Sequence, residues 1–398
     1  MSQTAREFAA PIPFDTERLD TLMDHAGMNV LIASSKHNVQ YLMGDDYRFF
    51  FFDYMDAIGR SRYLPLLVYP KGAPDKAAYF GYRMEAYEKQ VRRLWVPEMR
   101  PCTSGTLDAM AAAVDYINRL GIPASRIGAE LAFLPADAHS TLRTGIPNSD
   151  VIDAVIVLER LRAKKTPEEL QKLRTASEQV VGAMLKVMAG HGPGVTKREM
   201  VEALRREEVN RGLTFEYCLI TAGTSLNRSP SDQRWEKGDI LSLDSGGNYH
   251  GYIGDLCRMA IQGEPDSELN DLLAEVDAIQ QAAIRPIREG ALGASIYAGA
   301  EAAMERSPNR RCIEFVAHGM GLVSHEVPHL TDKGPVPYSA DDAERPLEVG
   351  MVLSIETTMQ HPKRGFIKLE DTVAVRKDGS EMLGDQGRGW NRGGTAPH

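Results

Sequence analysis

The sequence predicts an α+β protein built from two domains, residues 1–160 and residues 161–398. Three observations support this prediction. The length of 398 residues is typical of two domains. The first domain alternates short apolar runs with helical patterns, which favours an α/β arrangement with a mixed or parallel sheet. The second domain carries long strand-like runs separated by a few helices, a layout typical of the α+β class.

In the first domain, one helix and five strands follow from the apolar pattern. Residues 16–26 have helical spacing, and Gly27 can end that helix. The predicted strands are residues 30–33, 64–69, 77–80, 126–131 and 151–157. The aromatic run at 49–52 is expected either in the core or in a contact with a second chain.

The second domain begins with two capped helices. Thr166 can cap the first helix, with Pro167 at the first helical position and Glu169 completing a capping box. A second box, Thr196 with Glu199, starts the next helix after the sequence HGPG.

Strands dominate the remainder of the chain. The predicted strands are residues 217–221, 240–243, 252–261, 351–357 and 366–375, and the predicted helices are residues 267–283 and 294–306. The tail after Gly384 is rich in Gly and Arg. We expect it to be disordered, the alternative being that it wraps a neighbouring molecule through Trp390.

Composition excludes several classes of function. A net charge of −9 argues against binding to nucleic acid or to anionic lipid. The four cysteines are far apart and form no C-x-x-C, so neither a disulfide framework nor a thiolate zinc site is supported. No apolar run is long enough to cross a membrane, and no leader sequence is evident. We therefore expect a cytoplasmic protein with reduced thiols.

Two aspartates mark the first candidate site. Asp244 ends one predicted strand and Asp255 lies in the next. If the hairpin folds about Tyr249 and His250, the two carboxylates lie directly opposite each other on one face. Like charges placed so closely in an apolar strand pair are costly unless a cation neutralises them.

Two glutamates repeat this arrangement near the C-terminus. Glu356 and Glu370 lie on two strands that a turn at Lys363 would bring opposite each other. The four carboxylates of the two hairpins carry about four negative charges, which two divalent cations would balance.

A histidine extends the carboxylate set toward a metal site. His318 is followed by glycines at 319 and 321, which allow the backbone to approach closely. One imidazole with four carboxylates is an oxygen-rich set, which suits Mn²⁺, Fe²⁺, Co²⁺ or a zinc ion of expanded geometry. Two such ions can generate a bound hydroxide and polarise a carbonyl.

At these residues the sequence resembles the pita-bread metallopeptidases: methionine aminopeptidase, aminopeptidase P and prolidase. The resemblance covers the whole chain, with a creatinase/prolidase-type N-terminal domain followed by a pita-bread catalytic domain. The matching motifs are DSG at 244–246, DLCR at 255–258, HGMG at 318–321, HEVP at 325–328, GMVLSIE at 350–356 and ED at 370–371.

The resemblance implies a set of metal ligands. They are Asp244, Asp255, His318, Glu356 and Glu370. It implies two divalent ions, manganese first, with cobalt, iron or zinc as alternatives, and it implies that Asp255 and Glu370 bridge them. It also implies a homodimer.

The resemblance also implies catalytic roles. A hydroxide bridging the metals attacks the substrate carbonyl, and Glu356 acts as the general base toward it. His325 matches a histidine that contacts the substrate near the scissile carbonyl, a role that fits stabilisation of the developing oxyanion.

Three departures from the family pattern surround the substrate. Asn227 stands where the peptidases of the family carry a histidine that holds the substrate amide, and Arg228 beside it can bind a substrate carboxylate. Lys368 replaces an arginine that prolidases commonly carry, and it supplies a point charge instead of a bidentate fork. The usual IEPG is IETT at 355–358. The chemistry is expected to be retained and the specificity altered.

The resulting prediction is a dinuclear metal-dependent hydrolase that cleaves an amide bond of a small substrate, by default an Xaa-Pro dipeptide. The alternative is a non-peptidase of the same fold that acts on a small metabolite, such as an ectoine-type hydrolase or a dimethylsulfoniopropionate-type lyase. A third alternative, a binding module without catalysis, is disfavoured because all five ligand positions are filled.

Overall fold

The structure is a computed structural model that describes residues 10–44, 57, 63–91, 94–334, 336 and 338–395. The chain forms two compact units, Met1–Leu161 and Arg162–His398, which are described in turn. The aromatic run at 49–52 lies outside the described residues.

The first unit is a mixed six-stranded sheet in the order β4-β3-β2-β1-β5-β6. Its strands are β1 (Val30–Ala33), β2 (Leu66–Pro70), β3 (Ala78–Tyr82), β4 (Glu98–Thr103), β5 (Arg126–Ala129) and β6 (Asp150–Asp153). Its helices are α1 (Thr16–Ala26), α2 (Lys36–Met43), α4 (Glu88–Val91), α5 (Thr106–Arg119), α6 (Ala136–Gly145) and α7 (Val155–Arg162), with 3₁₀ turns η2 (Pro74–Lys76) and η3 (Arg83–Tyr87). Two separate groups of buried apolar side chains form its core.

The apolar pattern predicts helix α1 and five of the six strands of this unit, but neither β4 nor the other helices. Helix α1 ends where Gly27 adopts a left-handed conformation with φ 69°. The strand predicted over 151–157 is wrong in its second half, because β6 ends at Asp153 and α7 begins at Val155. The Asp153 carboxylate accepts hydrogen bonds from the backbone N–H groups of Leu131 and Val155, which fixes the chain reversal there.

The second unit is built on an eight-stranded sheet with the main order β12-β13-β14-β11-β10-β8, to which β15 adds beside β14 and β16 beside β11. The strands are β8 (Thr214–Ala222), β10 (Ile240–Tyr249), β11 (Tyr252–Ile261), β12 (Ile313–Gly319), β13 (Val352–His361), β14 (Gly365–Val375), β15 (Ser380–Leu383) and β16 (Asn391–Arg392). The helices are α8 (Pro167–Gly190), α9 (Lys197–Asn210), α10 (Ser267–Ile284) and α11 (Ala294–Met304), with the 3₁₀ turn η4 (Arg310–Cys312) and the small pair β7 (Val195–Thr196) and β9 (Arg234–Trp235).

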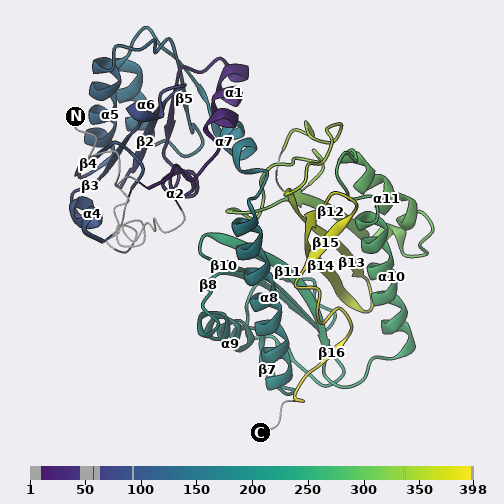
Figure 1. Cartoon of the computed structure of the whole chain (residues 1–398). Coiled ribbons are helices and arrows are strands. Elements are labelled where there is room, and N and C mark those ends of the chain that lie inside the picture. Colours follow the sequence, from purple (N-terminus) through teal and green to yellow (C-terminus); the bar gives the residue numbers. More distant parts are fainter. Residues whose placement is uncertain are drawn as a thin grey trace. The chain divides into compact units, whose positions relative to one another are not determined.

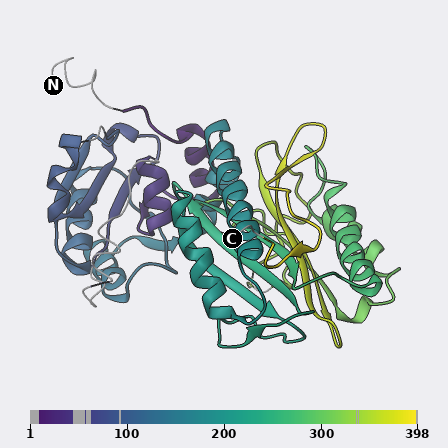
Figure 2. The same ribbon diagram turned by 90° about the horizontal axis from the view of Figure 1, so that it is seen from below.

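Helices α8 and α10 lie against one face of the large sheet (Figures 1 and 2). The backbone of β11 approaches α8 so closely at Gly254 that an added Cβ would lie 2.7 Å from the Ser177 nitrogen. Arg388 joins Asp371 of β14 to Asp277 of α10 by ion pairs. Successive strand residues point to opposite faces of a sheet. Asp255, which follows Gly254, and Glu370, which precedes Asp371, therefore point to the face that these helices leave uncovered.

The two ligand-bearing hairpins differ in register. Glu356 lies opposite Glu370, as predicted. The predicted pairing of Asp244 with Asp255 is wrong, because Asp255 lies opposite Gly246. The β10–β11 hairpin closes on His250 and Gly251, whose φ values of 53° and 96° fit a two-residue turn of the type that twisted strands favour. The register is shifted by an even number of residues, so both aspartates still point to one face.

The C-terminal tail is ordered through residue 395, so the expectation of disorder is wrong for the described part of the tail. Strand β16 pairs in parallel with β11, and the Trp390 indole N–H donates to the Leu269 carbonyl at 3.1 Å. The tail therefore packs against the second unit of its own chain. Within the described part of the chain, no helix is long and apolar enough to cross a membrane. The cysteines are all free.

Candidate metal centre

Five neighbouring strands each contribute one of the five predicted ligands. In sheet order β12-β13-β14-β11-β10 these residues are His318, Glu356, Glu370, Asp255 and Asp244. The strand register places all five on one face. Glu356 pairs directly with Glu370. Each of the other three lies two residues along its strand from the residue that pairs with a ligand on the neighbouring strand, and side chains two residues apart point to the same face. The folded sheet thus gathers residues that are up to 126 positions apart in sequence, from 244 to 370.

Three of these side chains form a group suited to a cation. Asp255, His318 and Glu370 are buried, and one potential ligand atom from each lies within 4.8 Å of the others. Asp255 Oδ1 and His318 Nε2 make no hydrogen bond, whereas Glu370 Oε2 forms an ion pair with the Lys368 ammonium. Buried polar atoms of native proteins are nearly always satisfied, so two such atoms beside the Glu370 carboxylate fit a bound divalent ion.

Electrostatics support the same reading. Burial, reinforced by the carboxylates of Glu370 and Asp244, raises the pKa of Asp255 well above its usual value. Ionised carboxylates in this position are costly unless a cation neutralises them. The donor set therefore fits a divalent metal ion.

The ring of His318 is arranged as a ligand would be. Its Nδ1 lies 3.2 Å from the Gly319 carbonyl oxygen, which favours the proton on that nitrogen and leaves Nε2 with a lone pair. Burial lowers the pKa of His318 to about 4, so the imidazole is neutral at physiological pH. Nε2 lies 3.7 Å from Glu356 Oε1 and 4.0 Å from Glu370 Oε1.

Lys368 lies inside the carboxylate cluster. Its ammonium is 2.6 Å from Asp244 Oδ2, 2.5 Å from Glu356 Oε2 and 2.7 Å from Glu370 Oε2. Burial alone would lower the pKa of Lys368, but the three carboxylates outweigh it and raise that pKa well above its usual value. Arg228 forms a second ion pair with Asp244 and stacks over the Phe366 ring, so it too reaches the cluster.

The loop after β12 places a second histidine over the first. The rings of His318 and His325 are stacked, with centroids 3.7 Å apart. Glu326 holds this loop in place through buried ion pairs with Arg162 at 2.7 Å and Lys165 at 2.8 Å. A shallow pocket opens beside the two histidines and is lined in part by Leu330, Val336 and Tyr338.

Asn227 stands apart from the cluster. Its side chain is exposed, and its oxygen accepts a hydrogen bond from the Ser229 backbone N–H at 2.8 Å. The carboxamide therefore shapes a loop turn. Of the three predicted substrate contacts, Lys368 and Arg228 touch a predicted ligand and Asn227 makes no such contact in the described structure.

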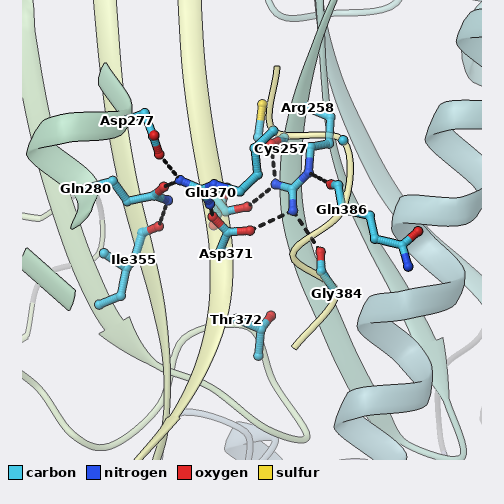
Figure 3. A network of polar contacts seen from close by, with 12 residues as sticks. Cys257, Arg258, Asp277, Gln280, Ile355, Glu370, Asp371, Thr372, Gly384 and Gln386 are labelled. Atoms are coloured by element: carbon cyan, nitrogen blue, oxygen red, sulfur yellow. Dashed lines mark hydrogen bonds and ion pairs between the residues drawn. The ribbon is translucent and has the colours of Figure 1, made fainter. Parts of the chain in front are cut away.

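A buried arginine ties the ligand strands together on the covered face (Figure 3). Arg258 donates to the carbonyl of Glu370 at 2.9 Å and to the Asp371 carboxylate at 2.6 Å. It also donates to the carbonyls of Gly384 and Gln386 in the tail. The DLCR and ED motifs pointed to these residues, but sequence reasoning assigned them no role, because their contacts depend on the fold of the C-terminal tail.

The family model described as metallopeptidase family M24 matches residues 171–377, and the creatinase/prolidase N-terminal domain matches residues 16–164. An uncharacterised peptidase of Bacillus subtilis is 23% identical over 376 residues, covering 92% of this chain and 96% of the relative. An Xaa-Pro dipeptidase of Pyrococcus furiosus is 27% identical over 233 residues, covering 57% of this chain and 64% of the relative.

Solved structures share the fold. An Xaa-Pro dipeptidase from Bacillus anthracis superposes with a TM-score of 0.78 at 21% identity, covering 98% of this chain and 99% of the other. A prolidase from Pyrococcus horikoshii gives 0.75 at 21% identity, covering 93% and 97%. At this identity the structural likeness establishes the architecture alone, which is the predicted α+β pair of a creatinase-type domain and a pita-bread domain. Since the M24 model spans more than half of its residues, the chain belongs to metallopeptidase family M24 and is a metallopeptidase-like hydrolase.

Proposed function

We propose that this chain is a metal-dependent peptidase that cleaves Xaa-Pro dipeptides at the cluster of Asp244, Asp255, His318, Glu356 and Glu370. The observation that carries the proposal is that these five side chains lie on one face of five adjacent strands, where the buried ligand atoms Asp255 Oδ1 and His318 Nε2 make no hydrogen bond. A divalent cation bound there supplies Lewis acidity toward a carbonyl and lowers the pKa of a water molecule. The oxygen-rich donor set favours manganese, with cobalt, iron or zinc as alternatives.

Glu356 is proposed as the general base. It is the least enclosed of the four carboxylates, with its side chain 12% exposed, against 4% for Asp244 and 2% for Glu370. It can therefore reach a water molecule at the open face and pass that proton to the leaving nitrogen.

His325 is proposed to stabilise the oxyanion. Its ring is half-buried and stacks on the ligand His318, which holds it beside the reacting carbonyl. Burial lowers the pKa of His325 to about 4, so it acts as a neutral hydrogen-bond donor.

Hydrolysis assays test this function. Protein stripped with a chelator and reloaded with Mn²⁺ is assayed on a panel of Xaa-Pro dipeptides beside Glu356→Gln and the exposed control Glu344→Gln. The proposal predicts cleavage by the wild type and by the control, and a loss of at least about 1000-fold with Glu356→Gln, since the base is removed without changing the shape of the side chain. Cleavage that survives Glu356→Gln contradicts the assigned base. No cleavage of any dipeptide contradicts the substrate class.

A second candidate substrate is a small non-peptide amide. The observation in its favour is Asn227, whose carboxamide oxygen is engaged in its own loop where the peptidases carry a substrate-binding histidine. The same protein assayed on cyclic and acylated amine solutes separates the two candidates. A homodimeric assembly and a cytoplasmic location stay predictions from the sequence.

A further inference from the structure

The ammonium of Lys368 occupies the centre of a carboxylate cluster that would otherwise be free for metal ions. It is within 2.7 Å of oxygens from Asp244, Glu356 and Glu370, and its side chain is 4% exposed. The three N–H donors of a lysine ammonium match three acceptors. Lys368 points into the cluster because it lies two residues before Glu370 on β14 and therefore shares its face.

The cluster is thereby divided into two halves. On one side, Asp255, His318 and Glu370 offer ligand atoms within 4.8 Å of one another, and Asp255 Oδ1 and His318 Nε2 make no hydrogen bond. On the other side, Asp244 Oδ2 is engaged by both Lys368 and Arg228. The first half keeps two buried acceptor atoms without a partner. In the second half both basic side chains contact Asp244, and Lys368 reaches from there to Glu370.

Charge counting agrees with this division. Asp244, Asp255, Glu356 and Glu370 bring four negative charges, and the two basic side chains bring two positive ones. The remaining charge of minus two is balanced by one divalent cation. A second divalent ion beside Asp244 would lie against the Lys368 ammonium and would be repelled by it.

We propose that this chain binds a single divalent cation at Asp255, His318 and Glu370, and that Lys368 takes the place of a second metal ion beside Asp244. This inference rests on the proposed metal-dependent function and narrows it, because it replaces the expected pair of ions with one ion and one fixed ammonium. Lys368 would then hold Asp244 and Glu356 in place whether or not substrate is present.

Metal counting tests the inference without an activity assay. The full chain is stripped, dialysed against excess Mn²⁺ and then against buffer, and its bound manganese is measured per chain. The wild type is expected to retain one ion. Lys368→Met keeps the length of the side chain and removes its charge, so it is expected to retain two, with the electron paramagnetic resonance spectrum of a coupled manganese pair.

The controls distinguish the possible failures. Lys363→Met, at an exposed position of the β13–β14 turn, is expected to retain one ion like the wild type. Two ions in the wild type overturn the inference and leave the proposed function standing, whereas none in a folded wild type overturns both. The wild-type count decides the question even if Lys368→Met does not fold. If it folds, a Lys368→Met that still retains only one ion contradicts the role given to Lys368.

Discussion

Individual buried charges hold the catalytic unit in shape. Glu326 is fully buried, and it pairs with both Arg162 and Lys165, which are themselves nearly inaccessible. Against the cost of burial, these two cations lower the pKa of Glu326 below its usual value. Because Glu326 follows His325 directly, this triad sets the position of the proposed oxyanion donor.

Glu326→Gln is expected to destabilise the protein by about 3–5 kcal/mol, since it leaves two buried cations without their counter-charge. Urea unfolding followed by circular dichroism measures the change. The matched control is Glu202→Gln, which breaks an exposed pair with Arg205 and should change stability little. Equal effects of the two substitutions would contradict this account of the triad.

A second buried carboxyl group makes stability depend on pH. Burial raises the pKa of Glu208 to about 8, against the pull of its hydrogen bond with Ser245. The folded state therefore binds a proton that the unfolded state releases near pH 4.5, and the stability that the proton supports is lost as the pH rises through this window.

Glu208→Gln removes this dependence. The stability of the variant relative to the wild type is expected to grow by about 1.4 kcal/mol for each pH unit between about pH 5 and pH 8. Urea unfolding of both proteins at four pH values across that range measures it. A difference that does not vary with pH would show that Glu208 is ionised throughout.

At the scale of elements, close packing of a helix on a strand places a ligand. Helix α8 lies against β11 at Gly254, where an added Cβ would meet the Ser177 nitrogen at 2.7 Å and the Ala176 carbonyl carbon at 2.8 Å. Both atoms belong to the helix backbone and cannot rotate away. The next residue on the strand is Asp255, so the approach of α8 determines where this carboxylate lies.

Gly254→Ala is expected to push β11 away from α8, to cost about 1–3 kcal/mol and to weaken Mn²⁺ binding. The control is Gly379→Ala, since nothing lies within 4 Å of the position where its Cβ would be. Unfolding and manganese titration are measured on both variants. Wild-type manganese affinity in a folded Gly254→Ala protein would show that α8 does not set the position of Asp255.

Sequence reasoning succeeded at this scale where local signals agree. The capping box of Thr166 and Glu169 begins α8 as predicted, and Gly27 ends α1. Strand β12, which carries His318, is absent from the predicted strands, because a strand ending in glycine has a weak pattern. The β10–β11 turn was misplaced because His250 adopts a left-handed conformation, which is uncommon for residues other than glycine and cannot be predicted from its residue type.

At the scale of the whole molecule, the C-terminal tail packs against the sheet that carries the site. Arg388 pairs with Asp371 on β14 and with Asp277 on α10, while Arg258 binds the carbonyls of the same tail (Figure 3). The composition of the tail suggested disorder, because its polar side chains find partners only in the assembled fold. For the same reason, the sequence placed Lys368 near Glu370 but could not show that its ammonium reaches Asp244 on a strand two places away in the sheet.

Arg388→Met is expected to cost about 1–3 kcal/mol, because it removes one of the two partners of the buried Asp371 carboxylate. Arg392→Met is the matched control, since its partner Glu264 is 81% exposed, and its stability should stay close to that of the wild type. Thermal unfolding of the two variants measures the difference. A tail that contributes nothing to the fold would leave both variants unchanged.

The central claim is that five strands of this sheet build a metal centre. Anomalous diffraction from crystals grown with Mn²⁺ tests it most directly, because manganese is located independently of any assay. The account predicts an anomalous peak within bonding distance of Asp255, His318 and Glu370. Crystals in which manganese leaves no peak at those side chains, with Asp255 and Glu370 ordered, would contradict it.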